Sequence, residues 1–152
     1  MNPGDIAPDF TAATPDGPLT LSSLRGGPVV LYFYPKDDTP ACTQEARDFS
    51  DLATEFAAAG ARLIGVSKDS AAKHGKFAAK HALAVTLVSD EGGDLCERYG
   101  VWGEKTLYGK TYMGIVRSTF LIDPQGRIAQ VWPKVSVKGH AEAVLAALRA
   151  LA

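Results

Sequence analysis

Cysteine and histidine are scarce in this 152-residue sequence, which contains two cysteines and three histidines. Their spacing matches no metal-ligand pattern, so we expect neither a metal site nor a cofactor. Without an acidic neighbour in the sequence, His74, His81 and His140 are expected at the surface. Two widely separated cysteines, in a chain long enough to bury a core without disulfides, indicate thiol chemistry in a reducing compartment.

The sequence also lacks an excess of charge and a long apolar run. Its formal net charge is −1 and its Lys and Arg residues are scattered, so neither nucleic acid nor an anionic membrane is expected as a partner. No stretch approaches the roughly 18 apolar residues of a membrane span, and the first residues lack the basic and apolar regions of a signal peptide. We therefore expect a cytoplasmic protein with one domain over residues 1–152.

The most informative residue present is Cys42, which lies where an apolar segment gives way to an amphipathic one. Thr39 is a favourable N-cap residue and Pro40 suits the first helical position, so Cys42 falls at the third position of a helix. Free backbone N–H groups and the positive end of the helix dipole stabilise an anion there, which for cysteine is the nucleophilic thiolate. The alternative is a small buried cysteine. The Thr-Pro pair before the thiol favours the reactive interpretation.

The hydrophobic pattern predicts alternating strands and helices in the first two thirds of the chain. Residues 10–21 predict a hairpin around Pro15-Asp16-Gly17, and the continuous apolar run 29–34 predicts a strand buried on both faces. The spacing of apolar residues predicts a helix over 39–59, which Gly60 ends. The elements expected next are strand 62–67, helix 71–81, strand 85–88 and short helix 90–99.

The last third of the chain predicts an irregular segment, a hairpin and a helix. Residues 101–115 follow no regular period, and the glycines within them do not have the spacing of a nucleotide-binding P-loop. Residues 116–123 and 127–132 predict a hairpin around Asp123-Pro124-Gln125-Gly126, and residues 141–151 predict a terminal amphipathic helix. The whole layout is typical of an α/β fold of the thioredoxin-like type, a central mixed sheet flanked by helices with an N-terminal β-hairpin.

Several motifs resemble one family of thiol enzymes. Residues 34–45, Tyr-Pro-Lys-Asp-Asp-Thr-Pro-Ala-Cys-Thr-Gln-Glu, resemble the active-site loop of peroxiredoxins, and most closely that of Q-type peroxiredoxins, also called bacterioferritin comigratory proteins. The resemblance extends over most of the chain and implies a thiol-dependent peroxidase that acts on hydroperoxides on a thioredoxin fold. The other matching motifs lie at residues 4–10, 89–91, 99–105 and 117–123.

The resemblance implies roles for three catalytic residues. Cys42 would be the peroxidatic cysteine, which attacks one peroxide oxygen to give a sulfenic acid and release water or an alcohol. The Thr39 hydroxyl, the Cys42 backbone N–H and the Arg117 guanidinium would stabilise the charge on the leaving oxygen. Arg117 alone would be read as a solvated charge at a strand end. The resemblance instead places it at the thiolate.

Four further residues are candidates for the substrate pocket, and each has a structural alternative. Pro35 and Pro40 are expected to shape the loop and shield the sulfur, although a proline at the first helical position is also a common stabilising device. Tyr34 either lines the pocket or packs in the core. Glu45 either orients Arg117 or another basic group, or stabilises the first helical turn as an acidic residue.

One departure from the family pattern changes the expected mechanism. Many Q-type peroxiredoxins carry a resolving cysteine at the position that Arg47 occupies here. The only other thiol is Cys96, and a disulfide requires Cα atoms within about 7 Å, which is doubtful between two helices of a thioredoxin sandwich. We interpret Cys96 as a packed structural thiol beside Leu95 and Tyr99, with a resolving role as the alternative.

The sulfenic acid would then be resolved by an external thiol, such as thioredoxin, glutaredoxin or glutathione. A disulfide reductase is not expected, because Glu45 stands where a Cys-x-x-Cys motif would place its second cysteine. The alternative functions are a redox sensor that passes Cys42 oxidation to a partner protein, and a two-cysteine peroxidase that uses Cys96. The resemblance implies a monomer, with a weak dimer as the alternative.

Overall fold

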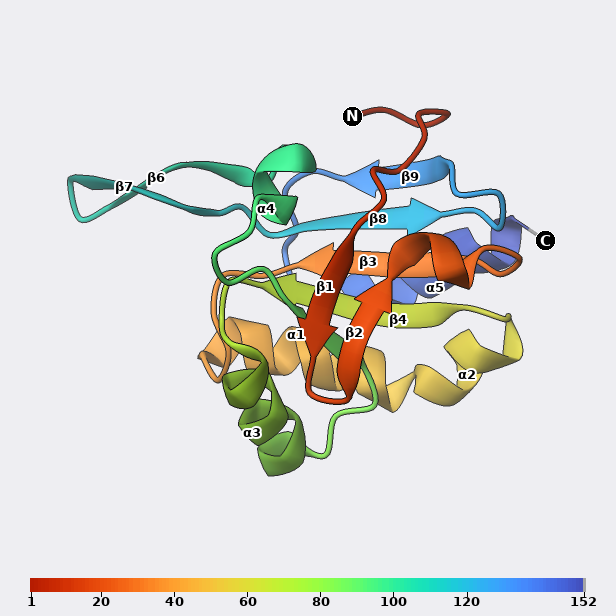
Figure 1. Cartoon of the computed structure of the whole chain (residues 1–152), viewed down its shortest axis with the longest axis horizontal. Coiled ribbons are helices and arrows are strands. Elements are labelled where there is room, and N and C mark those ends of the chain that lie inside the picture. The colour runs from red at the N-terminus through yellow and green to blue at the C-terminus, as the bar shows by residue number, and fades with distance from the viewer. Residues whose placement is uncertain (152) are drawn as a thin grey trace.

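A seven-stranded mixed sheet forms the centre of the computed structural model, which describes residues 1–151 (Figure 1). The strand order is β2-β1-β5-β4-β3-β8-β9. Strands β3, β4 and β5 run parallel, whereas β8, β9 and the β1–β2 hairpin pair antiparallel. The thioredoxin-like sandwich and its N-terminal hairpin are thereby confirmed. The strands are β1 (Thr11–Thr14), β2 (Gly17–Thr20), β3 (Val29–Phe33), β4 (Arg62–Ser67), β5 (Thr86–Ser89), β8 (Ser118–Ile122) and β9 (Ile128–Trp132).

Two hydrophobic clusters fill the two faces of this sheet. Every residue of β3 is buried, with Val30 and Tyr32 in one cluster and Leu31 and Phe33 in the other. The continuous apolar run therefore marks a central strand, as predicted. The first cluster packs against α1 (Pro40–Asp51), α2 (Ala53–Ala58), α3 (Ala71–His81) and α5 (His140–Ala150), and the second packs against α4 (Leu95–Arg98) and the N-terminal segment with its 3-10 turn η1 (Leu21–Leu24).

The helix predicted over 39–59 is divided into α1 and α2. Leu52 turns the backbone between them, and its N–H bonds back to Phe49 in the short pattern that tightens a last helical turn. Gly60 ends α2 with a φ of +79°, as its position predicted. Within residues 1–151 no helix has the length and apolar character needed to cross a membrane.

Residues 101–115, which we expected to be irregular, form a regular hairpin of β6 (Trp102–Leu107) and β7 (Lys110–Ile115). Its two-residue turn is Tyr108-Gly109, with φ values of +52° and +77° that match a type I′ turn. The hairpin projects from the body of the molecule, and within residues 1–151 its two strands pair only with each other (Figure 1). Most of its side chains are exposed on both faces, so the sequence carries no alternation to reveal the strands.

The prediction that the three histidines lie at the surface is wrong. His74 is fully buried, His140 is 6% exposed, and His81 is mostly covered. His74 and His81 each contact an aspartate more than 35 positions away, which the sequence alone does not pair. His140 contacts the Thr119 hydroxyl at 2.8 Å, and burial together with the nearby Arg117 charge lowers the pKa of His140 to about 4.

Candidate active site

The first turn of α1 places Cys42 at the end of the loop that follows β3. Thr39 is the N-cap residue with an extended backbone, and Pro40 begins the helix, as predicted. The Thr39 side chain caps no amide; its hydroxyl instead donates to the Lys36 carbonyl at 2.8 Å. The first-turn N–H groups beside the buried Cys42 sulfur are therefore free of a side-chain cap and available to an anion.

Arg117 brings a cation to the sulfur from the segment between β7 and β8. Its Nη2 donates to Cys42 Sγ at 3.2 Å, and its Nη1 donates to Glu45 Oε1 at 2.7 Å. Cys42 and Glu45 lie one helical turn apart, so a single guanidinium spans both. Burial lowers the pKa of Arg117, but the negative charges of Glu45 and Cys42 outweigh it and hold that pKa above its ordinary value.

Glu45 anchors the guanidinium from within the core. The residue is 1% exposed, and its Oε2 has no hydrogen-bond partner among the described residues. Burial raises the pKa of Glu45 to about 7, because it outweighs the opposing effect of Arg117. One carboxylate oxygen thus fixes Arg117, while the other lies desolvated in the core.

The free energy of unfolding is expected to fall as the pH rises from about 4.5 to about 7. In this window the folded chain keeps a proton on Glu45 that the unfolded chain has lost, so raising the pH favours unfolding. Each pH unit removes up to about 1.4 kcal/mol. Urea denaturation of the wild type and of Glu45→Gln between pH 4.5 and 8 measures the difference in slope. Equal slopes for the two proteins would contradict the assignment.

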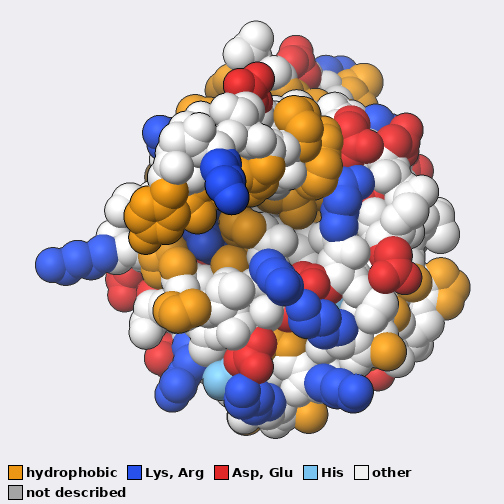
Figure 2. All heavy atoms as spheres, turned by 90° about the vertical axis from the view of Figure 1, so that its left-hand side faces the viewer, with side chains coloured by type: hydrophobic (Ala, Val, Ile, Leu, Met, Phe, Trp, Pro, Cys, Tyr) orange, Lys and Arg blue, Asp and Glu red, His pale blue; other side chains and the backbone are white. Residues whose placement is uncertain are grey.

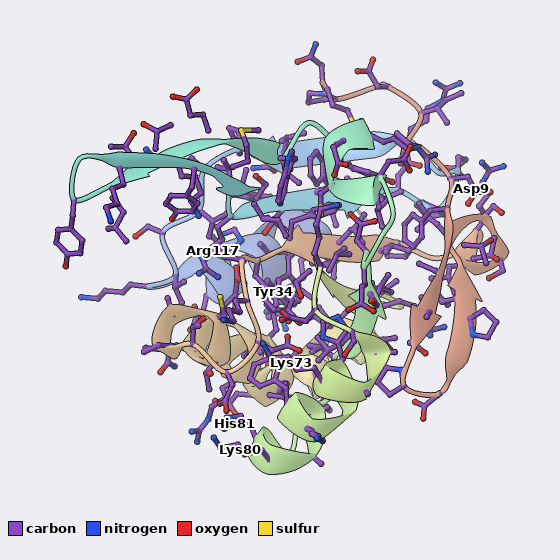
Figure 3. All side chains as sticks on the ribbon, turned by 60° about the vertical axis from the view of Figure 1, so that its left-hand side comes forward. Asp9, Tyr34, Lys73, Lys80, His81 and Arg117 are labelled. Atoms are coloured by element: carbon purple, nitrogen blue, oxygen red, sulfur yellow. The ribbon has the colours of Figure 1, made fainter. Side chains whose placement is uncertain are left out.

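The other predicted pocket residues lie around the loop at different depths. Pro35 is half-buried and Pro40 is exposed. Tyr34 is 1% exposed and donates its hydroxyl to Asp37 Oδ1 at 2.5 Å, which favours the packing alternative for this residue. In Figure 3 Tyr34 lies between Arg117 and helix α3, and its ring is close to those of His74 and Phe77 on that helix.

Two groups near the site were missed by sequence reasoning. Lys105 of β6 donates to the Ile115 carbonyl at 2.9 Å, and burial together with the neighbouring Arg117 charge lowers the pKa of Lys105. It lies in the 101–115 segment, which carried no strand signal. Figure 2 shows this end of the molecule, where hydrophobic side chains gather over the hairpin and Lys and Arg side chains spread below it.

The second missed group is a cluster of Asp37, Asp69 and His74 under the loop. Its potential ligand atoms already have partners: Lys73 Nζ lies 2.8 Å from Asp69 Oδ1, and Asp37 contacts Tyr34 and His74. Because these atoms already bond to other groups of the protein, we assign no metal to this cluster. Asp37 lies far along the sequence from Asp69 and His74, so no local pattern pointed to the cluster.

Cys96 lies on the other face of the sheet from Cys42. It is fully buried in the cluster that contains Phe33 and α4, whereas Cys42 belongs to the cluster that contains α1 and α5. Burial raises the pKa of the Cys96 thiol strongly, and the adjacent Asp90 adds to the effect. Both its position and its protonation make Cys96 a poor partner for the sulfur of Cys42.

Comparison with known proteins agrees with this geometry. Residues 3–131 match the AhpC/TSA family. The peroxiredoxin Bcp of Xanthomonas campestris is 51% identical over 154 residues, covering 96% of each chain. Among solved structures, the bacterioferritin comigratory protein of Xanthomonas campestris, studied for its alkyl peroxide reduction activity, has a TM-score of 0.88 and 48% identity over 93% of this chain and 91% of that one.

A further solved structure, a cysteine-to-serine mutant of PrxQ from Xylella fastidiosa, superimposes with a TM-score of 0.93 and is 41% identical, covering 99% of this chain and 97% of that one. Likeness at this level, over nearly the full length of both chains, establishes the family and not only the fold. The chain therefore belongs to the AhpC/TSA family and is a peroxiredoxin of the Bcp or Q type, a thiol-dependent peroxidase.

Proposed function

We propose that this peroxiredoxin reduces hydrogen peroxide and organic hydroperoxides through a sulfenic acid on Cys42, which an external thiol then reduces. The observation that carries the proposal is the 3.2 Å contact between Arg117 Nη2 and Cys42 Sγ, held in place by Glu45. The contact places a fixed positive charge and a hydrogen-bond donor beside the reacting sulfur, where negative charge moves onto the peroxide oxygens during the attack. The alkyl peroxide reduction activity of the Xanthomonas relative supports organic hydroperoxides as substrates.

In the oxidation step the Cys42 thiolate attacks one peroxide oxygen. The S–O bond forms as the O–O bond breaks, and the leaving oxygen takes a proton to become water or an alcohol. Arg117 and the free first-turn N–H groups stabilise the negative charge that develops on the oxygens. Thr39 contributes as a donor only after its hydroxyl rotates away from the Lys36 carbonyl.

In the resolution step a thiolate of the reductant attacks the Cys42 sulfenic sulfur and water leaves. A second thiol then attacks the resulting mixed disulfide, which releases Cys42 and an oxidised reductant. Thioredoxin, glutaredoxin and glutathione each supply this chemistry. Because Cys42, Arg117 and Glu45 all come from one chain, the site is complete in a monomer. We place the enzyme in the cytoplasm, because thioredoxin, glutaredoxin and glutathione are kept reduced there.

Replacing Cys96 with serine is expected to leave turnover within about twofold of the wild type, because Cys96 lies on the other face of the sheet from Cys42 and the exchange of sulfur for oxygen changes the side-chain volume little. Hydrogen peroxide consumption is measured for both proteins with dithiothreitol, glutathione-glutaredoxin or thioredoxin in parallel. The reductant that supports steady consumption identifies the partner.

Each other outcome points to a different function. If Cys96→Ser stalls after one turnover, Cys96 is the resolving thiol and the enzyme is a two-cysteine peroxidase. A single oxidation of the wild type, followed by a stable mixed disulfide, indicates a redox sensor that signals through a partner. No oxidation of wild-type Cys42 by peroxide would overturn the proposed function.

A further inference from the structure

The loop between β3 and α1 is attached to helix α3 by a buried tie, which consists of Tyr34, Asp37 and His74. Asp37 is 2% exposed and His74 is fully buried. The Asp37 carboxylate accepts the Tyr34 hydroxyl at Oδ1, 2.5 Å away, and its Oδ2 lies 2.6 Å from His74 Nδ1. This contact joins the active-site loop to an element that contributes nothing to the sulfur directly.

The hydrogen bonds of His74 define how the buried tie holds its proton. His74 Nε2 lies 3.0 Å from the Val88 carbonyl, which only accepts, so Nε2 carries a hydrogen. One further proton lies between His74 Nδ1 and Asp37 Oδ2. Wherever it resides, the contact is a hydrogen bond between two groups that have no access to water. Removing either partner leaves the other buried and unpaired, which is costly.

Three further contacts hold the same loop to the same side of the molecule. The Asp37 N–H donates to Asp69 Oδ2 at 2.8 Å. Asp38, whose φ of +61° is unusual for a residue other than glycine, contacts Lys80 Nζ at 2.7 Å and His81 Nε2 at 2.8 Å. In Figure 3 Lys73, Lys80 and His81 lie together on α3, below Tyr34.

The position of the loop decides what reaches Cys42. Cys42 is 2% exposed and its sulfur lies against Arg117, so the arrangement suits a small peroxide but excludes a bulky thiol. Access for a protein thiol requires the loop and the first turn of α1 to move away from α3. A local motion of this kind is governed by the few contacts that hold the segment.

We propose that Asp37 and His74 are positioning residues that hold Cys42 beside Arg117 and keep its sulfur closed to bulky thiols. The inference rests on the proposed function of Cys42. The pair thereby favours reaction with peroxide at the expense of access for a protein reductant. Loosening the pair is expected to slow the reaction of Cys42 with peroxide and to speed its reaction with bulky thiols. A general loss of stability, caused by a substitution far from the loop, is not expected to produce these two opposite changes together.

The test compares Asp37→Ala with Asp37→Asn in a Cys96→Ser background, so that Cys42 is the only thiol. Asparagine keeps the geometry, because its Oδ1 accepts from Tyr34 and its amide donates to neutral His74. The control is Ile128→Ala, which removes a buried side chain on the opposite face of the sheet. Two rates are measured at the same pH: single-turnover oxidation of Cys42 by hydrogen peroxide, and labelling of reduced Cys42 by a polyethylene-glycol maleimide.

Asp37→Ala is expected to slow oxidation about tenfold or more, since small displacements of reacting groups carry large kinetic costs. Its maleimide labelling is expected to accelerate severalfold, while Asp37→Asn stays near the wild type in both rates. If Asp37→Ala does not fold, Tyr34→Phe removes one hydrogen bond of the tie and is expected to show smaller changes of the same signs.

Three outcomes would overturn the inference: unchanged rates in Asp37→Ala, changes equal to those in Ile128→Ala, or Asp37→Asn as impaired as Asp37→Ala. If Asp37→Ala does not fold and Tyr34→Phe is measured in its place, unchanged rates in Tyr34→Phe would also overturn the inference. A wild type whose Cys42 does not react with peroxide would instead overturn the proposed function. The labelling rates do not depend on peroxidase activity, so the two failures are distinguishable.

Discussion

Serine at position 42 is expected to abolish peroxide consumption with every reductant while leaving the fold intact. The change exchanges one sulfur for one oxygen at a buried position in the first turn of α1, so packing is little altered. A serine hydroxyl is not ionised at neutral pH and forms no sulfenic acid, and the neighbouring Arg117 does not compensate for the lost nucleophile. Hydrogen peroxide consumption and mass spectrometry of the oxidised protein measure the effect.

The matched control for this variant is Cys96→Ser, which makes the same chemical change at the other buried cysteine. It is expected to keep both consumption and the mass increase of one oxygen on Cys42. Persistent consumption by Cys42→Ser would show that the chemistry lies elsewhere. Loss of the folded circular dichroism spectrum in Cys42→Ser alone would make that variant uninformative about catalysis, and the mass increase in Cys96→Ser would then carry the test.

Arg117→Met is expected to slow oxidation of Cys42 by about 10²- to 10³-fold, the usual effect of removing one preorganised donor to a developing oxyanion. Methionine fills a similar volume but supplies neither the charge nor the hydrogen bond to the sulfur. The oxidation rate of Arg117→Lys is expected to lie between those of the wild type and Arg117→Met, because an ammonium cannot bond to Glu45 and Cys42 with the fork geometry of a guanidinium. Single-turnover kinetics with hydrogen peroxide give these rates.

Removal of Arg117 also leaves Glu45 buried without a partner, which lowers stability by itself. The double variant Arg117→Met/Glu45→Gln separates the two effects. It is expected to recover stability in urea denaturation but to oxidise as slowly as Arg117→Met. If oxidation recovers together with stability, Arg117 acts only as structural support for the helix and not on the peroxide.

The sequence predicts the segment that carries the nucleophile because the signals there are local. Residues 29–34 are apolar without interruption, and a strand with neighbours on both sides and helices on both faces has such a sequence. Thr39 and Pro40 begin α1 where their preferences place them. The helix start, and with it the position of Cys42, therefore follows from a few adjacent residues.

The partners of these residues could not be predicted in the same way. Arg117 lies 75 positions from Cys42, and only the pairing of β8 with β3 brings it to the sulfur. It was placed by family resemblance, because a single arginine before a strand is more often solvated. His74 is separated from Asp37 by 37 positions and carries no local signal. The β6–β7 hairpin was missed because its strands bury neither face.

The placement of the two cysteines on opposite faces of the central sheet determines which thiols can react with Cys42 after its oxidation. The sheet is filled on both sides, so a bond between the two sulfurs would require unfolding of the domain's centre. In the proposed cycle the sulfenic acid on Cys42 therefore waits for a thiol from outside the chain, because Cys96 does not reach it. Until that thiol arrives, a second peroxide can oxidise the sulfenic acid to a sulfinic acid, so the concentration of thiol around the enzyme governs how much of it survives a burst of oxidant.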